Sequence, residues 1–120
     1  RKVIQFLKKQ KKIKEILYPH KKGSKNYKNW KKYYSGATGL LSLVIKSKSK
    51  ASVYKFINSL ELFGIGYSWG GFESLAVYQD LQREHPKYED KNLHIVRLHI
   101  GLEDPNDLIV DIKNSLRYIK

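Results

Sequence analysis

The sequence contains no cysteine and no methionine, and only four of its 24 basic residues are arginine. Without cysteine, disulfides and thiolate metal sites are excluded, and nothing in the composition indicates an oxidising compartment. No apolar run approaches the roughly 20 residues that cross a bilayer, so we expect a cytoplasmic protein. Because Arg1 is not an initiator methionine, we expect the chain to start inside a longer reading frame or after a trimmed start.

Positive charge is concentrated in the first part of the chain. Residues 1–50 carry 16 basic residues and one acid, Glu15, whereas residues 51–120 carry 8 basic and 10 acidic residues. Such asymmetry is a hint of a nucleic-acid or membrane-surface partner. However, lysine, isoleucine, tyrosine and asparagine are all encoded by A/T-rich codons, and arginine, which reads bases and phosphates bidentately, is scarce. We favour compositional drift and solvated helix faces, with a nucleic-acid-binding module as the alternative.

The pattern of apolar residues predicts one α+β domain, a small and mainly antiparallel sheet covered by helices. Helices are expected at residues 1–17, 26–34 and 51–62, and after Asp104, which is placed as an N-cap before Pro105. An aromatic stripe in the second helix is expected in the core. Strands are expected at residues 40–45, 74–78 and 93–100, with a short strand in the glycine-rich segment 64–71 and an exposed excursion at 79–91.

Several familiar motifs fail when their spacing is tested. Gly64 and Gly66 begin a dinucleotide fingerprint, but Trp69 occupies the place of its third glycine. The four histidines show no ligand spacing, and His94 and His99 would point to opposite faces of one strand, so no metal site is predicted. There is no nucleophile elbow.

Two segments remain as candidates for function. Residues 66–75 combine paired glycines with an aromatic residue and serines, which suits either a backbone brought close to a ligand or a tight structural turn. Arg97 lies in the middle of an apolar strand, where an unpaired charge is costly. It is either paired with a carboxylate of the protein or directed at an anionic ligand, and the residues alone leave both open.

Together these segments resemble a known family. The sequences YSWGGFESL (residues 67–75) and VRLHIGLED (residues 96–104) resemble the trans-sulfuration enzymes, the PLP-dependent enzymes of cystathionine and methionine metabolism. The resemblance extends to LYP, SGATGLLS, LELF and DLI, at residues 17–19, 35–42, 60–63 and 107–109, so it covers essentially the whole chain. The synthases and γ-lyases usually show SLGG where this chain has SWGG, and the tryptophan form resembles the bacterial cystathionine β-lyases.

The resemblance implies a fold and a set of roles. The chain would be the small C-terminal domain of a fold-type I PLP-dependent enzyme, with residues 1–20 as a helix connecting to a large domain and residues 21–120 as the substrate-closing domain. Arg97 would bind the substrate α-carboxylate, Ser68 would help to place that carboxylate and the catalytic lysine, and Trp69 would line the pocket. Gly70 and Gly71 would let the loop turn without side-chain obstruction.

The resemblance also implies what these 120 residues lack. No lysine lies in the context of the family's Schiff-base lysine, so PLP would be bound by a large domain, joined in cis or supplied in trans, and the chain is expected to be inactive alone. The implied reaction is β-elimination of cystathionine to homocysteine, pyruvate and ammonia, with a γ-lyase or γ-synthase as the alternative within the family. Intact members are usually homotetramers.

Overall fold

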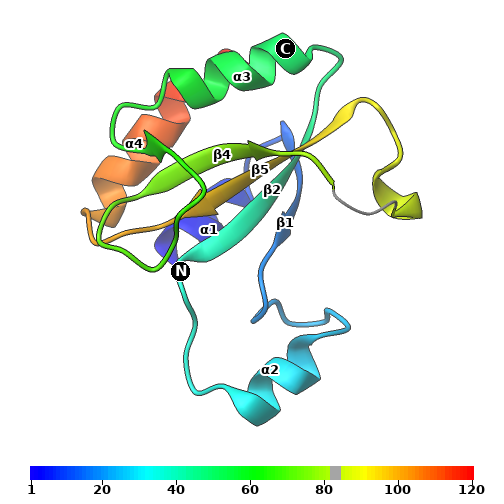
Figure 1. Ribbon diagram of the computed structural model, residues 1–120, viewed down its shortest axis with the longest axis vertical. Helices are drawn as coiled ribbons and strands as arrows, with labels where there is room; N and C mark the ends of the chain where they lie inside the picture. The colour runs from blue at the N-terminus through cyan, green and yellow to red at the C-terminus, as the bar shows by residue number, and fades with distance from the viewer. Residues whose placement is uncertain (82–84) are drawn as a thin grey trace.

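The computed structural model describes residues 1–81 and 85–120 (Figure 1). Its elements are, in chain order, α1 (Lys2–Leu7), β1 (Ile13–Leu17), α2 (Tyr27–Tyr33), β2 (Leu40–Lys46), α3 (Lys50–Asn58), β3 (Gly64–Ile65), β4 (Leu75–Gln79), the 3₁₀ turn η1 (Pro86–Tyr88), β5 (Leu93–His99) and α4 (Pro105–Leu116). The strands form one sheet in the order β1-β2-β5-β4-β3. Among the described strands only β3 and β4 pair in parallel, which confirms the predicted α+β fold with a mainly antiparallel sheet.

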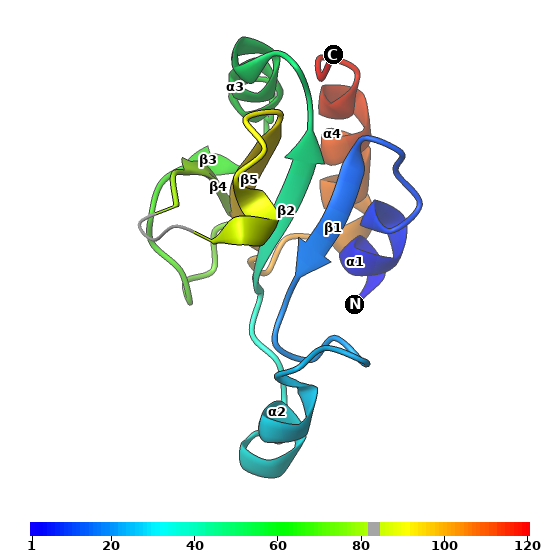
Figure 2. The ribbon, with the colours of Figure 1, turned by 90° about the vertical axis from the view of Figure 1, so that its right-hand side faces the viewer.

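The core lies between one face of the sheet and the helices α1, α3 and α4. Alternate residues of β2 and β5 point into it, as the period of two in a strand requires. In Figure 2, α1 and α4 lie to the right of the strands and α3 lies above them, while α2 extends away at the bottom. Fully buried side chains from both layers meet in a single apolar cluster, which includes Leu7, Leu43, Ile45, Val53, Phe56, Val96, Leu98, Leu108 and Ile112.

The predicted helix at residues 1–17 is wrong in its extent. Helix α1 ends at Leu7, and Gln10, the polar break in the apolar pattern, donates from its side chain to the carbonyl oxygen of Phe6 at 3.1 Å. Residues 13–17 instead form the edge strand β1, with an irregularity in its pairing to β2 between Ile13 and Glu15. Apolar residues four apart share a face in a helix and also in a strand, so the pattern predicts both.

Helix α1 contributes to the core of the domain. Its residues Val3, Ile4 and Leu7 are buried in the same cluster as α3, α4 and the sheet. Residues 1–20 and 21–120 therefore share one hydrophobic core. The proposed connection to a large domain stays a prediction.

The aromatic stripe of α2 is not in the core, contrary to expectation. No residue of α2 is buried, and Tyr33 and Tyr34 are 68% and 67% exposed. The helix lies on an arm, residues 18–39, that projects from the sheet (Figures 1 and 2). Tyr27 stacks on Trp30 with ring centroids 5.6 Å apart, and Trp30 Nε1 donates to the carbonyl oxygen of Gly36 at 3.0 Å. Tyr27 and Trp30 of the stripe therefore make their contacts within the arm and not with the core.

Helices α3 and α4 begin where capping chemistry predicts. Ser49 accepts from the Ser52 backbone N–H, and Asp104 accepts from that of Asn106 with Pro105 in the first turn. Within residues 1–81 and 85–120, none of these helices has the length and apolar character needed to cross a membrane.

Candidate carboxylate-binding site

Arg97 lies on the face of the sheet that the three core helices leave uncovered. Its neighbours on β5, Val96 and Leu98, are fully buried on the helix side. Across the sheet it pairs with Ser42 of β2 and Val77 of β4. Because side chains alternate along a strand, an arginine can occupy a central strand here without entering the apolar core. The side chain is half-buried.

The guanidinium of Arg97 is bonded to a backbone carbonyl. Its Nη2 donates to the carbonyl oxygen of Tyr67, and its Cζ lies 5.8 Å from the centroid of the Tyr67 ring. Among residues 1–81 and 85–120, no carboxylate lies within ion-pair distance of it. Of the two readings left open by the sequence, pairing with a protein carboxylate therefore has no support in this part of the chain.

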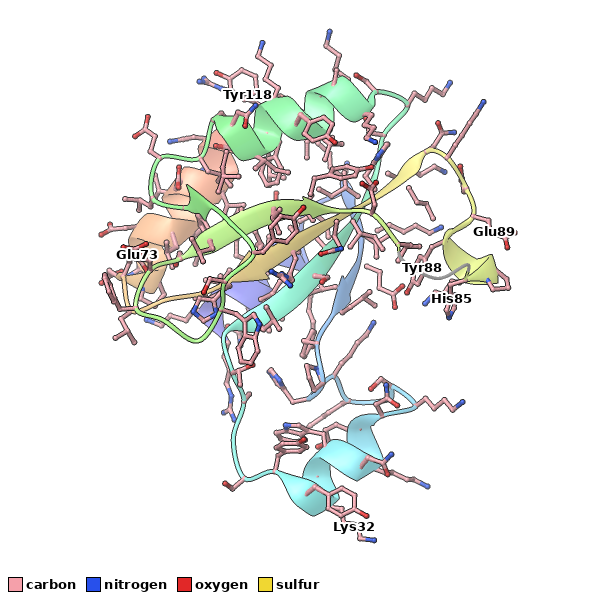
Figure 3. The ribbon with its side chains drawn as sticks, in the orientation of Figure 1. Lys32, Glu73, His85, Tyr88, Glu89 and Tyr118 are labelled. Carbon is pink, nitrogen blue, oxygen red and sulfur yellow. The ribbon has the colours of Figure 1, made fainter. Side chains whose placement is uncertain are left out.

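A groove of about 420 Å³ runs from Arg97 along the uncovered face to the end of β1. The acid at its rim, Glu15, is already paired: it lies 3.2 Å from Lys21 Nζ and 2.7 Å from Lys87 Nζ. Tyr88 of η1, which is labelled in Figure 3, donates to the same carboxylate at 3.4 Å. The hydrogen bond from Lys87 is the largest cause of a lowered pKa at Glu15. Arg97 is thus the cation of this groove without an acidic partner in the described residues.

The predicted loop residues flank this arginine. Tyr67, whose carbonyl receives the Arg97 bond, directly precedes Ser68 and Trp69, and both of these are exposed, Trp69 to 62%. Gly70 has φ +82°, a conformation that residues with side chains rarely adopt. No hydrogen bond in the described part of the chain joins Ser68 or Trp69 to Arg97. The structure therefore brings the loop backbone to the arginine and leaves both side chains free toward solvent.

His99 holds the glycine turn of this loop, a role that the sequence did not reveal. The residue is 6% exposed; its Nε2 lies 3.0 Å from the carbonyl oxygen of Gly71, and its Nδ1 accepts from the Gly70 N–H at 3.4 Å. His94, as predicted, faces the other side of β5, where it contacts Tyr78 Oη and the Ser47 carbonyl, both at 2.9 Å. The signal that could have found this role was a histidine at a buried strand position.

Glu103 fixes the other end of the loop. Its carboxylate accepts from the backbone N–H of Ser74 at 2.9 Å and from the Ser74 hydroxyl at 2.8 Å. That hydroxyl in turn accepts from the Gly101 N–H at 2.8 Å. Ser74 is fully buried, and its satisfied polar network ties the start of β4 to the turn after β5. In the sequence Glu103 follows Gly101 by two positions, and this spacing alone does not predict a contact with Ser74.

We expect this network to weaken in acid. Burial alone would raise the pKa of the Glu103 carboxyl, but the hydrogen bonds from the backbone N–H and the hydroxyl of Ser74 lower this pKa below the ordinary value. The ionised network therefore contributes stability above about pH 4.3, and this contribution is lost as pH falls through the lowered pKa. Thermal unfolding between pH 3 and 7 should show a shallower acid decline for Glu103→Gln than for the wild type. Glu73→Gln, which alters an exposed carboxyl (Figure 3), should leave the slope unchanged.

The residues around Arg97 suit a carboxylate better than a PLP cofactor. Phosphate groups are commonly held at helix N-termini or by several backbone N–H groups. Here the core helices pack on the opposite face, and the starts of α3 and α4 are capped by Ser49 and Asp104. The lysine that lines the groove, Lys21, is paired with Glu15. A single planar guanidinium with two parallel donors matches a carboxylate.

A solved structure shares this fold. A protein assigned as an O-acetylhomoserine (thiol)-lyase of Campylobacter jejuni, which carries a pyridoxyl-lysine phosphate, matches with a TM-score of 0.73 and 31% identity. The match covers 96% of this chain and 26% of that one. The fold is therefore that of a domain of a PLP-dependent enzyme.

The chain belongs to the family of Cys/Met metabolism PLP-dependent enzymes, whose family model matches residues 1–117. It is 37% identical over 118 residues to cystathionine beta-lyase of Escherichia coli, and this match covers 92% of this chain and 29% of that protein. It is 34% identical over 117 residues to an L-alanine/L-glutamate racemase of Wolbachia pipientis, covering 95% and 29%. The chain thus spans less than a third of the length of these relatives.

Proposed function

We propose that this chain is the substrate-closing C-terminal domain of a PLP-dependent carbon–sulfur lyase that performs β-elimination on cystathionine. The observation that carries the proposal is Arg97, a half-buried guanidinium beside a glycine-turn loop, with no acidic partner among the described residues. In this role Arg97 binds the substrate α-carboxylate through two parallel N–H bonds. The tryptophan at position 69 and the beta-lyases among the relatives favour cystathionine as the substrate.

The cofactor in this proposal is held by a large domain outside these 120 residues. When bound, PLP would supply an electron sink for negative charge that develops at the substrate α-carbon. The residues of this chain orient the substrate: Arg97 binds the carboxylate, Ser68 helps to place it, and Trp69 lines the pocket near the substrate. Gly70 and Gly71 keep the backbone of the loop clear of the substrate. On this basis the chain alone should neither absorb as a PLP enzyme nor release pyruvate.

A chimera tests the proposal directly. In it, this chain replaces the matching part of the Escherichia coli cystathionine beta-lyase, the 37% identical relative. We expect the purified chimera to bind PLP and to release pyruvate from cystathionine. A chimera that folds and binds PLP but releases no pyruvate would overturn the assignment as a β-lyase. Conversion of L-alanine to its enantiomer by the same sample would favour the racemase activity for which the Wolbachia relative is named.

Nucleic-acid binding is the competing proposal, and the projecting arm is the observation that favours it. The arm carries lysines 21, 22, 25, 28, 31 and 32 with no acid, and it exposes Tyr33 and Tyr34. Lysines beside exposed aromatic rings suit single-stranded nucleic acid. Binding of a labelled oligonucleotide should then fall steeply with salt, and neutralising Lys28, Lys31 and Lys32 should reduce that slope. A sample without salt-dependent binding excludes this role.

A further inference from the structure

The two contacts of His99 define its protonation state. The Gly71 carbonyl can only accept a hydrogen bond, so the imidazole Nε2, 3.0 Å away, carries the proton. The Nδ1 atom is then the acceptor for the Gly70 N–H at 3.4 Å. One neutral ring therefore bonds both to a donor and to an acceptor of the glycine turn. Because the side chain is buried, water does not readily replace either bond.

Further contacts fix the loop on both sides of this turn. Upstream, Arg97 donates to the Tyr67 carbonyl, and downstream the Leu102 N–H donates to the Phe72 carbonyl at 2.8 Å. Ser68 and Trp69 are bracketed between the fixed positions 67 and 70. The Trp69 side chain is 62% exposed and has little packing of its own. The direction in which it leaves the loop is therefore set by the backbone that His99 holds.

We propose that His99 is a positioning residue for the carboxylate site. It acts through the Gly70–Gly71 turn, which fixes Ser68 and Trp69 beside Arg97. His99 and Arg97 are two residues apart on β5 and therefore lie on the same face of the strand. The inference rests on the proposed function for its consequence in catalysis, whereas the clamp on the loop is a property of this chain alone. The two parts are tested separately.

The clamp is measured in the 120-residue chain. The sequence has two tryptophans, so Trp30→Phe leaves Trp69 as the single fluorescent indole. In that background, His99→Ala should make Trp69 about twofold more accessible to acrylamide quenching and should accelerate amide hydrogen exchange at Gly70 about tenfold. His99→Gln, whose side-chain amide can reach the Gly71 carbonyl, should restore most of the wild-type quenching.

His94 provides the matched control. It is a second buried histidine of β5 with two hydrogen bonds, on the opposite face of the strand. His94→Ala should lower the melting temperature about as much as His99→Ala, yet leave Trp69 quenching unchanged. Equal release of Trp69 by both variants, or no release by His99→Ala in a folded sample, overturns the proposal.

The chimera separates the clamp from the chemistry. There, His99→Ala should raise KM for cystathionine about tenfold with a smaller effect on kcat, because substrate placement is loosened while Arg97 remains. A lower kcat with an unchanged KM would indicate only a smaller fraction of folded, active enzyme, and it would contradict a positioning role for His99. If the unsubstituted chimera is inactive, the proposed function fails, while the quenching contrast in the 120-residue chain still decides whether His99 holds the loop.

Discussion

Replacing Arg97 by alanine is expected to lower kcat/KM for cystathionine in the chimera about 100- to 1000-fold. Hydrogen bonds to charged groups contribute about 1.5–3 kcal/mol each. Two parallel bonds at the lower end of this range contribute about 3–4 kcal/mol together, which corresponds to a loss of this size. Arg97 has no acidic partner in the described residues and is half-buried on the sheet face opposite the core helices, so its removal leaves no protein carboxylate without a partner. The measurement is the initial rate of pyruvate release across cystathionine concentrations.

The lysine variant distinguishes charge from geometry. Arg97→Lys keeps the positive charge but loses the planar fork, so we expect its kcat/KM to lie between those of the wild type and the alanine variant. Melting temperatures of all three proteins should agree within a few degrees, because Arg97 faces away from the apolar core and its one bond within the described residues is to the carbonyl of the exposed Tyr67. An alanine variant that retains more than about a third of wild-type kcat/KM would rule out a carboxylate role for Arg97.

Gly101→Ala should destabilise the domain by about 3 kcal/mol or more, enough to unfold much of a marginally stable protein. A Cβ at this position would overlap the Phe72 carbonyl oxygen and would lie 2.7 Å from the carbonyl carbon of Glu73. Both are backbone atoms, held by the Leu102 bond to Phe72 and by the Ser74–Glu103 network. Neither can retreat like the end of a flexible side chain, so the loop and the turn must separate.

Urea unfolding followed by circular dichroism measures this effect. Gly36→Ala is the matched control, since a Cβ there meets nothing within 4 Å and the backbone conformation is not one that requires glycine. We expect its free energy of unfolding to stay within about 0.5 kcal/mol of that of the wild type. A Gly101→Ala protein as stable as the Gly36→Ala protein would show that the loop does not pack as tightly against the turn as described.

Local patterns predicted the elements whose own residues determine their form. The apolar run of β2, the β-branched content of β5 and the capping sequence of α4 each act within a few residues, and all three elements were predicted within one or two residues. The same patterns failed where tertiary contacts decide. Residues 13–17 become a strand because β2 offers an unpaired edge, and α2 leaves its aromatic residues outside because no core surface reaches it.

The candidate site divides in the same way. Arg97 was visible as a charge in an apolar strand, and the loop glycines as a break in every periodic pattern. The residues that hold the site together, His99, Glu103 and Ser74, are joined across 27 to 29 positions of sequence. No spacing rule links positions so far apart, because their proximity follows from the pairing of β4 with β5.

The projecting arm has a consequence for how this sequence changes over generations. Since α2 contributes no buried residue, substitutions on its surface cost the fold almost nothing. Selection for a stable fold therefore acts weakly on the exposed side chains there, such as those of Lys31, Lys32 and Tyr33. The arm is accordingly the part of the molecule where mutational bias of the genome accumulates first, and where an inserted peptide tag or crosslinker would be tolerated best.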